Sequence, residues 1–135
     1  SSSSAASDVY KRQDVQRTMA VCAEDGAAAV ILALSEETLN DDALQSVNVD
    51  VLGCDDKGLS EAEIVKSVAR FGCTVGKQTH IAGRTQESDA LAAQATEAYG
   101  QTDSSALSLS IAMVLAAGVR KANIKSALRV SRDLN

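Results

Sequence analysis

The sequence has no proline and no tryptophan, and aromatic residues make up 2% of it. Residues 14–135 contain a single phenylalanine, Phe71, and a single tyrosine, Tyr99. A hydrophobic core cannot rely on aromatic side chains here, so it must be built from Ala, Val, Leu and Ile.

Cysteine is also scarce. Cys22, Cys54 and Cys73 are far apart and show no CxxC spacing. This pattern argues against a disulfide framework and against a structural zinc site, which needs closely spaced ligand pairs. We interpret the cysteines as small buried side chains in a reducing compartment.

Positive charge and long apolar runs are lacking as well. The 13 Lys and Arg residues are outnumbered by 18 Asp and Glu residues, for a net charge of −5. Surfaces that bind nucleic acid or anionic membranes need clustered Lys and Arg. The longest apolar run, residues 27–34, is too short to span a bilayer. We therefore predict a cytoplasmic protein with no nucleic-acid or membrane partner.

What the chain does contain is an alternation of strand-like and helix-like segments, which favours an α/β fold. We predict an open, mainly parallel sheet with flanking helices, incomplete at its N-terminus. Strands 27–34 and 47–52 should be parallel neighbours, covered by helices 60–71 and 105–117. The predicted strands span residues 27–34, 47–52 and 78–82, and the predicted helices span residues 14–25, 60–71, 88–99, 103–117 and 121–132.

Polar side chains follow the first two predicted strands. Ser35, Glu36 and Glu37 come after the first strand, and Asp55 and Asp56 come after the second. Ligands of open parallel sheets bind beyond the carboxyl ends of the strands. These five side chains should therefore converge and could coordinate Mg²⁺ through oxygen. The alternative is that they are solvated loop acids, because Asp-Asp-Lys-Gly is also an ordinary turn sequence.

Other chemical signals are few. The sequence lacks the common phosphate-loop, dinucleotide-binding, zinc-protease and serine-hydrolase motifs. Asp41 and Asp42 form a second acidic pair that could bind a divalent cation. We interpret His80, the only histidine, as a structural side chain within a strand, and Lys66 as part of a solvated helix face.

A helix-like segment with Gln16-Arg17 leads through Gly26 into the apolar run that ends before Ser35, and Val49-Asp50-Val51 follows. In this order, residues 14–51 resemble the central domain of the Mur ligases, especially the UDP-MurNAc-tripeptide synthetases. A second stretch, residues 105–128, is similar to the helix pair of that family written NALAAIAxALxLGxxxxxIxxAL. The positions in register in the first stretch are Gln16, Arg17, Gly26, Ala29, Val30, Ser35, Leu39, Val49, Asp50 and Val51.

The chain departs from the family at most catalytic positions. Ala33 stands at the strand-end glutamate, Ala43 stands at the substrate-binding arginine, and no histidine follows Asp50-Val51 to hold Mg²⁺. Of the family motif Ser-Ser-His, only Ser35 is retained, and Glu36 and Glu37 follow it. Lys66 is the candidate for the modified, metal-bridging lysine, but it is one residue out of step.

The resemblance implies a divergent fragment, either catalytic or non-catalytic, of an ATP-dependent amide ligase acting on a nucleotide-linked cell-wall precursor. Ser35, Glu36 and Glu37 would then bind substrate, and Asp55 and Asp56 would hold Mg²⁺. The ATP-binding loop would lie upstream of Asp14, so the rest of the chain would be a partner. If the protein is an enzyme, it would join an acid to an amino acid. Two alternatives remain open: an unrelated α/β small-molecule-binding domain, and a scaffold or interaction domain.

Residues 3–13 resemble the in-frame translation of a transposase sequencing adaptor. This resemblance implies that residues 1–13 are not native and that the native chain begins further upstream. We accordingly expect residues 14–135 to form a partial α/β domain.

Overall fold

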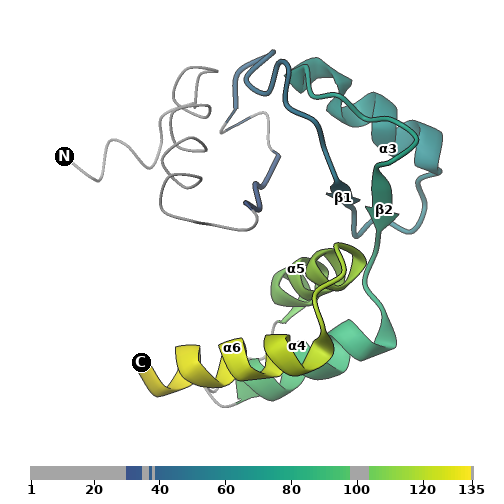
Figure 1. The fold of residues 1–135 in the computed structure, drawn as a ribbon. Coiled ribbons are helices and arrows are strands. Elements are labelled where there is room, and N and C mark those ends of the chain that lie inside the picture. The colour runs from purple at the N-terminus through teal and green to yellow at the C-terminus, as the bar shows by residue number, and fades with distance from the viewer. Residues whose placement is uncertain (1–29, 35–36, 38, 98–103, 135) are drawn as a thin grey trace. The chain divides into compact units, whose positions relative to one another are not determined.

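The computed structural model describes residues 30–34, 37, 39–97 and 104–134 (Figure 1). The chain divides into two compact units. The first unit comprises Ser1–Val49 and Ala62–Val75, and the second comprises Asp50–Glu61 and Gly76–Asn135. The elements in chain order are β1 (Val51–Gly53), α3 (Glu61–Val68), a 3₁₀-helix (Ala69–Phe71), β2 (His80–Ala82), α4 (Gln86–Glu97), α5 (Ser105–Ala116) and α6 (Lys121–Leu134).

The second unit contains a small parallel sheet. β1 and β2 pair in parallel with Leu52 opposite Ile81. Backbone hydrogen bonds continue past both ends of the pair, from His80 N to Asp50 O at 2.9 Å and from Cys54 N to Ala82 O at 3.0 Å. With its helices, this pair makes the second unit a mixed α/β structure.

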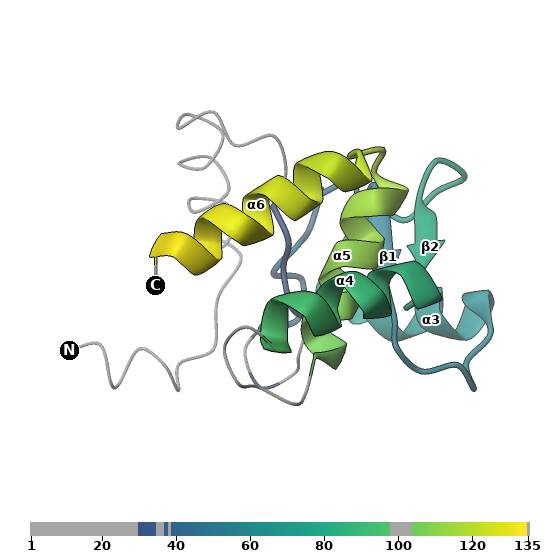
Figure 2. The ribbon, with the colours of Figure 1, turned by 90° about the horizontal axis from the view of Figure 1, so that it is seen from below.

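Helix α5 is the central layer of the second unit. Its sequence, SALSLSIAMVLA, is apolar on nearly all sides, as expected of a helix that is packed on more than one face. It contacts both strands and also α4, and α4 contacts α6 in turn (Figures 1 and 2). Leu91, Ala92, Ile111 and Ile124 form the buried cluster that joins the three helices.

A glycine allows α5 to approach β1 closely. A Cβ built on Gly53, the last residue of β1, would lie 2.7 Å from Met113 Cγ and would also overlap the sulfur. Real Cβ atoms essentially never come so near another heavy atom, so a larger residue at Gly53 would require the Met113 side chain to move. With glycine there, Met113 can pack directly against the end of β1.

The first unit contains α3 except for its first residue. Ile64, Val68 and Phe71 are buried and Val65 is half-buried, so the helix predicted over residues 60–71 has an apolar inner face. The 3₁₀-helix continues α3 as far as Phe71, and Gly72 then takes the left-handed conformation with φ of 81°. Glycine suits this position because it has no Cβ to clash in that conformation.

Backbone hydrogen bonds also connect two segments of the first unit. Thr74 N donates to Val47 O at 2.7 Å, and Val49 N donates to Thr74 O at 3.0 Å. Asn48 and Thr74 form an isolated parallel bridge there. Residues 47–52, predicted as one strand, thus form a bridge at Asn48 and a regular strand only from Val51.

The predicted strand over residues 27–34 is wrong for its described part. Residues 30–34 form no strand, and Val30 and Ile31 are 39% and 48% exposed. An apolar run becomes a strand only if a neighbour completes its hydrogen bonds, and β1 pairs instead with β2. Residues 27–29 and the predicted helix over residues 14–25 lie outside the described residues, as does the adaptor-like segment.

The three C-terminal helices agree well with prediction. Helix α5 and helix α6 begin and end within about two residues of the expected bounds, and Gly118 follows α5 with φ of 96°. Helix α4 begins at Gln86, before the predicted start, because Thr85 and not Ser88 or Asp89 caps it. The expectation for its last residues, 98 and 99, falls outside the described part.

Candidate ligand-binding site

The carboxyl ends of β1 and β2 carry a group of charged and hydroxyl side chains. Asp55 comes two residues after β1, and Arg84 comes two residues after β2. Because the strands are parallel and paired, both residues leave the sheet at the same edge. Open α/β sheets bind their ligands beyond this edge.

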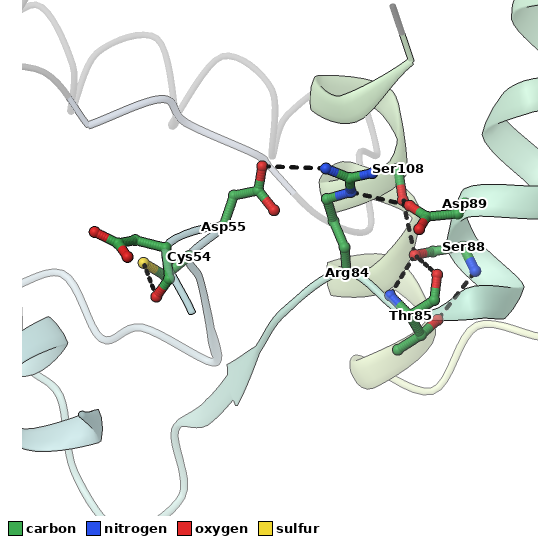
Figure 3. Close-up of polar contacts among 8 residues, drawn as sticks. Cys54, Asp55, Arg84, Thr85, Ser88, Asp89 and Ser108 are labelled. Carbon is green, nitrogen blue, oxygen red and sulfur yellow. Dashed lines mark hydrogen bonds and ion pairs between the residues drawn. The ribbon is translucent and has the colours of Figure 1, made fainter. Parts of the chain in front are cut away.

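Arg84 occupies the centre of this group (Figure 3). Its Nε donates to Asp89 Oδ1 at 2.9 Å, and its Nη1 lies 3.4 Å from Asp55 Oδ2. The guanidinium therefore bridges the loop after β1 and the first turn of α4. Its side chain is 32% exposed, so one side of the group still faces solvent.

The start of α4 is fixed by a reciprocal pair of caps. Thr85 Oγ1 accepts from Ser88 N at 3.0 Å, and Ser88 Oγ accepts from Thr85 N at 2.9 Å. This arrangement has the geometry of a capping box, with Ser88 taking the role usually filled by Glu or Gln. It holds Arg84 and Asp89, which flank the capped turn, in a defined backbone conformation.

A buried chain of hydroxyl groups ties this turn to α5. Ser108 Oγ donates to Asp89 Oδ1 at 2.6 Å, and Ser88 Oγ lies 2.8 Å from Ser108 Oγ. Ser108 has one proton and gives it to Asp89, so Ser88 is the donor to Ser108. Ser88 and Ser108 are fully buried. Their chain ends on a carboxylate, where hydrogen bonds are strengthened by charge.

The same contacts set the ionisation of Asp89. The hydrogen bond from Ser108 lowers the pKa of Asp89, and the hydrogen bond and charge of Arg84 lower it further. Lys57 contributes a smaller lowering through its charge, while partial burial opposes these effects. The hydrogen bond to Asp89 is in turn the main reason that the pKa of Arg84 is raised. Asp89 and Arg84 are thus a firmly charged pair.

Asp55 and Asp56, predicted as metal ligands, turn to different partners. Asp55 faces Arg84, whereas Asp56 Oδ1 accepts from Gly58 N at 2.9 Å and closes a turn. Ser35 and Glu36 lie outside the described residues. Glu37 belongs to the first unit and is exposed, so its predicted convergence with Asp55 and Asp56 stays a prediction.

The other candidate residues named from the sequence lie at the surface or are half-buried in the part of the chain that is described. Lys66 is exposed on α3. Asp41 Oδ1 accepts from Arg70 Nε and Nη2 at 3.1 and 3.0 Å. His80 begins β2, but its side chain is exposed, so the prediction of a structural imidazole is only partly right. Cys54 and Cys73 are free and half-buried, and burial raises the pKa of the Cys73 thiol.

The Mg²⁺ that the resemblance implies finds no matching ligand set in the part of the chain that is described. No group of three or more His, Cys, Asp or Glu side chains is gathered there. Asp55 already faces a guanidinium, and a cation beside Arg84 would be repelled by it.

Within the described ranges, no helix is both long and apolar enough to cross a membrane.

Sequence reasoning missed Arg84, Asp89 and Ser108. The signal for Arg84 was present, because Gly83-Arg84 follows the predicted strand 78–82 much as Gly53-Cys54-Asp55 follows the predicted strand 47–52. The same rule of strand ends that selected Asp55 also selects Arg84. Nothing local marked Ser108, whose role depends on how α5 packs against α4.

Comparison with known proteins adds no further constraint. No protein-family model, no curated protein and no solved structure matches the chain. Any functional assignment therefore depends on the geometry of the residues themselves.

Proposed function

We propose that the chain is part of a divergent, non-catalytic relative of the Mur ligases that binds an anionic group of a small molecule at Arg84. The observation that carries this proposal is the placement of a partly exposed guanidinium at the carboxyl edge of two parallel strands. An arginine there is well suited to an oxyanion, because its planar fork matches carboxylate and phosphate oxygens.

Arg84 also has donor capacity left for such a ligand. Its Nε and Nη1 face Asp89 and Asp55, while its Nη2 has no acceptor among the residues that the structure describes. A guanidinium offers five N–H donors. A ligand oxyanion that reaches Nη2 and the adjacent Nη1 would therefore complete the hydrogen bonding of the group.

The size of the sheet supports a larger parent structure. Parallel strands occur almost only in sheets of several strands with both faces covered. We therefore propose that β1 and β2 belong to an open, mainly parallel sheet, as in the sequence-based prediction. The helix pair over residues 105–128, which carries the C-terminal resemblance, is present as α5 and the first part of α6.

The proposed ligand follows from the same resemblance. A nucleotide-linked cell-wall precursor presents phosphate and carboxylate groups, and either would suit Arg84. ATP would bind upstream of Asp14, and the protein would work in the cytoplasm, which supplies ATP. We assign no chemical step, because the family's catalytic positions are unmatched and the described residues present no Mg²⁺ site. An unrelated α/β binding domain would use Arg84 in the same way.

Titration with simple oxyanions tests this function. In nuclear magnetic resonance spectra, the Nε–Hε signal of Arg84 and the backbone amide signals of Thr85 and Asp89, which every variant retains, should shift and saturate as acetate or inorganic phosphate is added. The variant R84Q should bind neither anion, while R120Q, at an exposed arginine at the start of α6, should bind as the wild type does. Equal binding by R84Q and wild type would reject the function and favour a scaffold.

A further inference from the structure

The two carboxylates beside Arg84 are held very differently. Asp89 lies 2.9 Å from Arg84 Nε, receives the 2.6 Å bond from Ser108, and sits on the first turn of α4. Asp55 approaches Arg84 only to 3.4 Å, although the side chains of Asp55 and Asp89 are about equally exposed, at 44% and 47%. A distance of 3.4 Å exceeds the usual range for a charge-assisted hydrogen bond. Asp89 is therefore the firm partner and Asp55 the weak one.

The backbone around Asp55 reinforces this difference. Asp55 lies on the loop between β1 and α3, and the turn in that loop is closed by its neighbour, Asp56. Asp55 has no second side-chain partner in the part of the chain that is described. Its carboxylate can move into water at little cost, because an exposed ion pair contributes only about 0–1 kcal/mol.

From this difference we infer that Asp55 is an internal competitor for Arg84, occupying the guanidinium until an external oxyanion displaces it. The inference rests on the proposed function and adds a regulatory element to the same site. Asp89 keeps the guanidinium aimed at the sheet edge throughout. Without ligand, the Asp55 carboxylate occupies the place beside Arg84 Nη1 that an oxygen of the ligand would take. When the ligand binds, the carboxylate moves away from Nη1.

The charge of the oxyanion decides which class of ligand binds best at Arg84. Arg84, Asp55 and Asp89 together carry one net negative charge, which Lys57 offsets only in part, and a second like charge close by is unfavourable. A singly charged carboxylate or phosphodiester can replace Asp55 without adding to the charge on the guanidinium. A doubly charged phosphate monoester meets more repulsion from Asp89. That repulsion is the same with and without the Asp55 charge, so we expect neutralising Asp55 to improve the binding of inorganic phosphate at least as much as that of acetate or dimethyl phosphate.

Neutralising Asp55 tests the inference directly. The variant D55N removes the competing charge and keeps the size of the side chain, while D56N removes the neighbouring charge that does not face Arg84. For acetate, we expect D55N to lower the dissociation constant about two- to fivefold. D56N should change it less, because charge removed farther from the guanidinium matters less. Because the amide oxygen introduced by D55N can still accept from Arg84, D55S serves as a second variant and should show the same gain.

The outcomes separate the inference from the function on which it rests. If R84Q abolishes binding but D55N and D55S bind acetate no better than D56N, Asp55 is not a competitor and the anion site stands. If both Asp55 variants bind more weakly, Asp55 contacts the ligand and the inference is overturned. If R84Q binds as well as wild type, the proposed function itself fails. Urea unfolding of each variant confirms that the fold is retained.

Discussion

Ser108 donates a hydrogen bond of 2.6 Å to Oδ1 of Asp89, and this bond connects the buried face of α5 to the first turn of α4. Arg84 binds the same oxygen through its Nε at 2.9 Å. One carboxylate oxygen thus receives a buried hydroxyl from one side and a half-exposed guanidinium from the other. The position of Arg84 therefore depends on how the helices of the second unit pack, as well as on its own strand.

Removing the Ser108 hydroxyl should destabilise the protein. In S108A, the buried Ser88 hydroxyl loses its nearer acceptor and Asp89 loses its shortest hydrogen bond. A hydrogen bond to a charged group contributes about 1.5–3 kcal/mol, and partial exposure of Asp89 reduces that contribution. We expect S108A to reduce the free energy of unfolding by about 1–2 kcal/mol, measured by urea denaturation.

The matched control for this change is S110A. Ser110 lies on the same helix and is half-buried, so the substitution is chemically identical and equally compatible with a helix. It should change the free energy of unfolding by less than about 0.5 kcal/mol. Equal losses in S108A and S110A would contradict a specific role for the chain of hydroxyl groups.

Asp89 should make stability depend on pH in the acid range. Its pKa in the folded protein is lowered from the ordinary value of 3.8, first by Ser108 and then by Arg84. In the range between the two pKa values, the unfolded state binds more protons, so stability rises with pH there. The contribution of Asp89 is present above about pH 4 and is lost as pH falls through the lowered pKa.

Urea unfolding at a series of acid pH values measures this effect. The variant D89N has no proton to bind at this position, so its stability should fall less steeply below about pH 4 than that of the wild type. The difference between the two curves isolates Asp89 from the other carboxylates. Parallel curves for D89N and wild type would show that the folded environment does not shift Asp89.

The sequence allowed some elements to be predicted and not others, for physical reasons. Helices α5 and α6 were predictable because their apolar spacing and the glycine at 118 are local signals. The strand predicted over residues 27–34 was wrong for residues 30–34, because an apolar run predicts burial but does not identify a hydrogen-bonding partner. In the site, Asp55 could be predicted as a site residue because it follows a predicted strand. The ion pair between Asp55 and Arg84 could not be predicted, since the two residues are 29 positions apart and meet only when β1 and β2 pair in register.

Glycines with positive φ should tolerate substitution poorly, and to different degrees. At Gly72, φ is 81° and a Cβ would lie 3.2 Å from the backbone of Gln45. At Gly118, φ is 96° but a Cβ would meet nothing within 4 Å. Left-handed backbone costs a residue other than glycine about 1–2 kcal/mol. We expect G118A to lose about this amount of folding free energy, and G72A to lose more because the steric contact adds to the strain.

Gly76 provides the control for these two substitutions. It has no positive φ and a Cβ there would meet nothing within 4 Å, so G76A should change stability by less than about 0.5 kcal/mol. Thermal or urea unfolding followed by circular dichroism ranks the three variants. The conformational argument fails if G118A proves as stable as G76A, and the steric argument fails if G72A loses no more than G118A.

The contact between Gly53 and Met113 gives a prediction that pairs two substitutions. In G53A, the new methyl group would lie 2.7 Å from Met113 Cγ, so the Met113 side chain must take another rotamer or α5 must shift. Overpacking of this kind costs about 1–3 kcal/mol. Substituting M113A removes the obstacle, at the cost of a half-buried side chain. In the M113A background, G53A should therefore lower the free energy of unfolding by at least about 1 kcal/mol less than it does in the wild type.

The control is G83A, one residue after β2, where the nearest atom to a Cβ is Cys54 O at an ordinary 3.5 Å. G83A should be close to neutral. Additive effects of G53A and M113A would show that the close approach of α5 to the end of β1 does not constrain the strand.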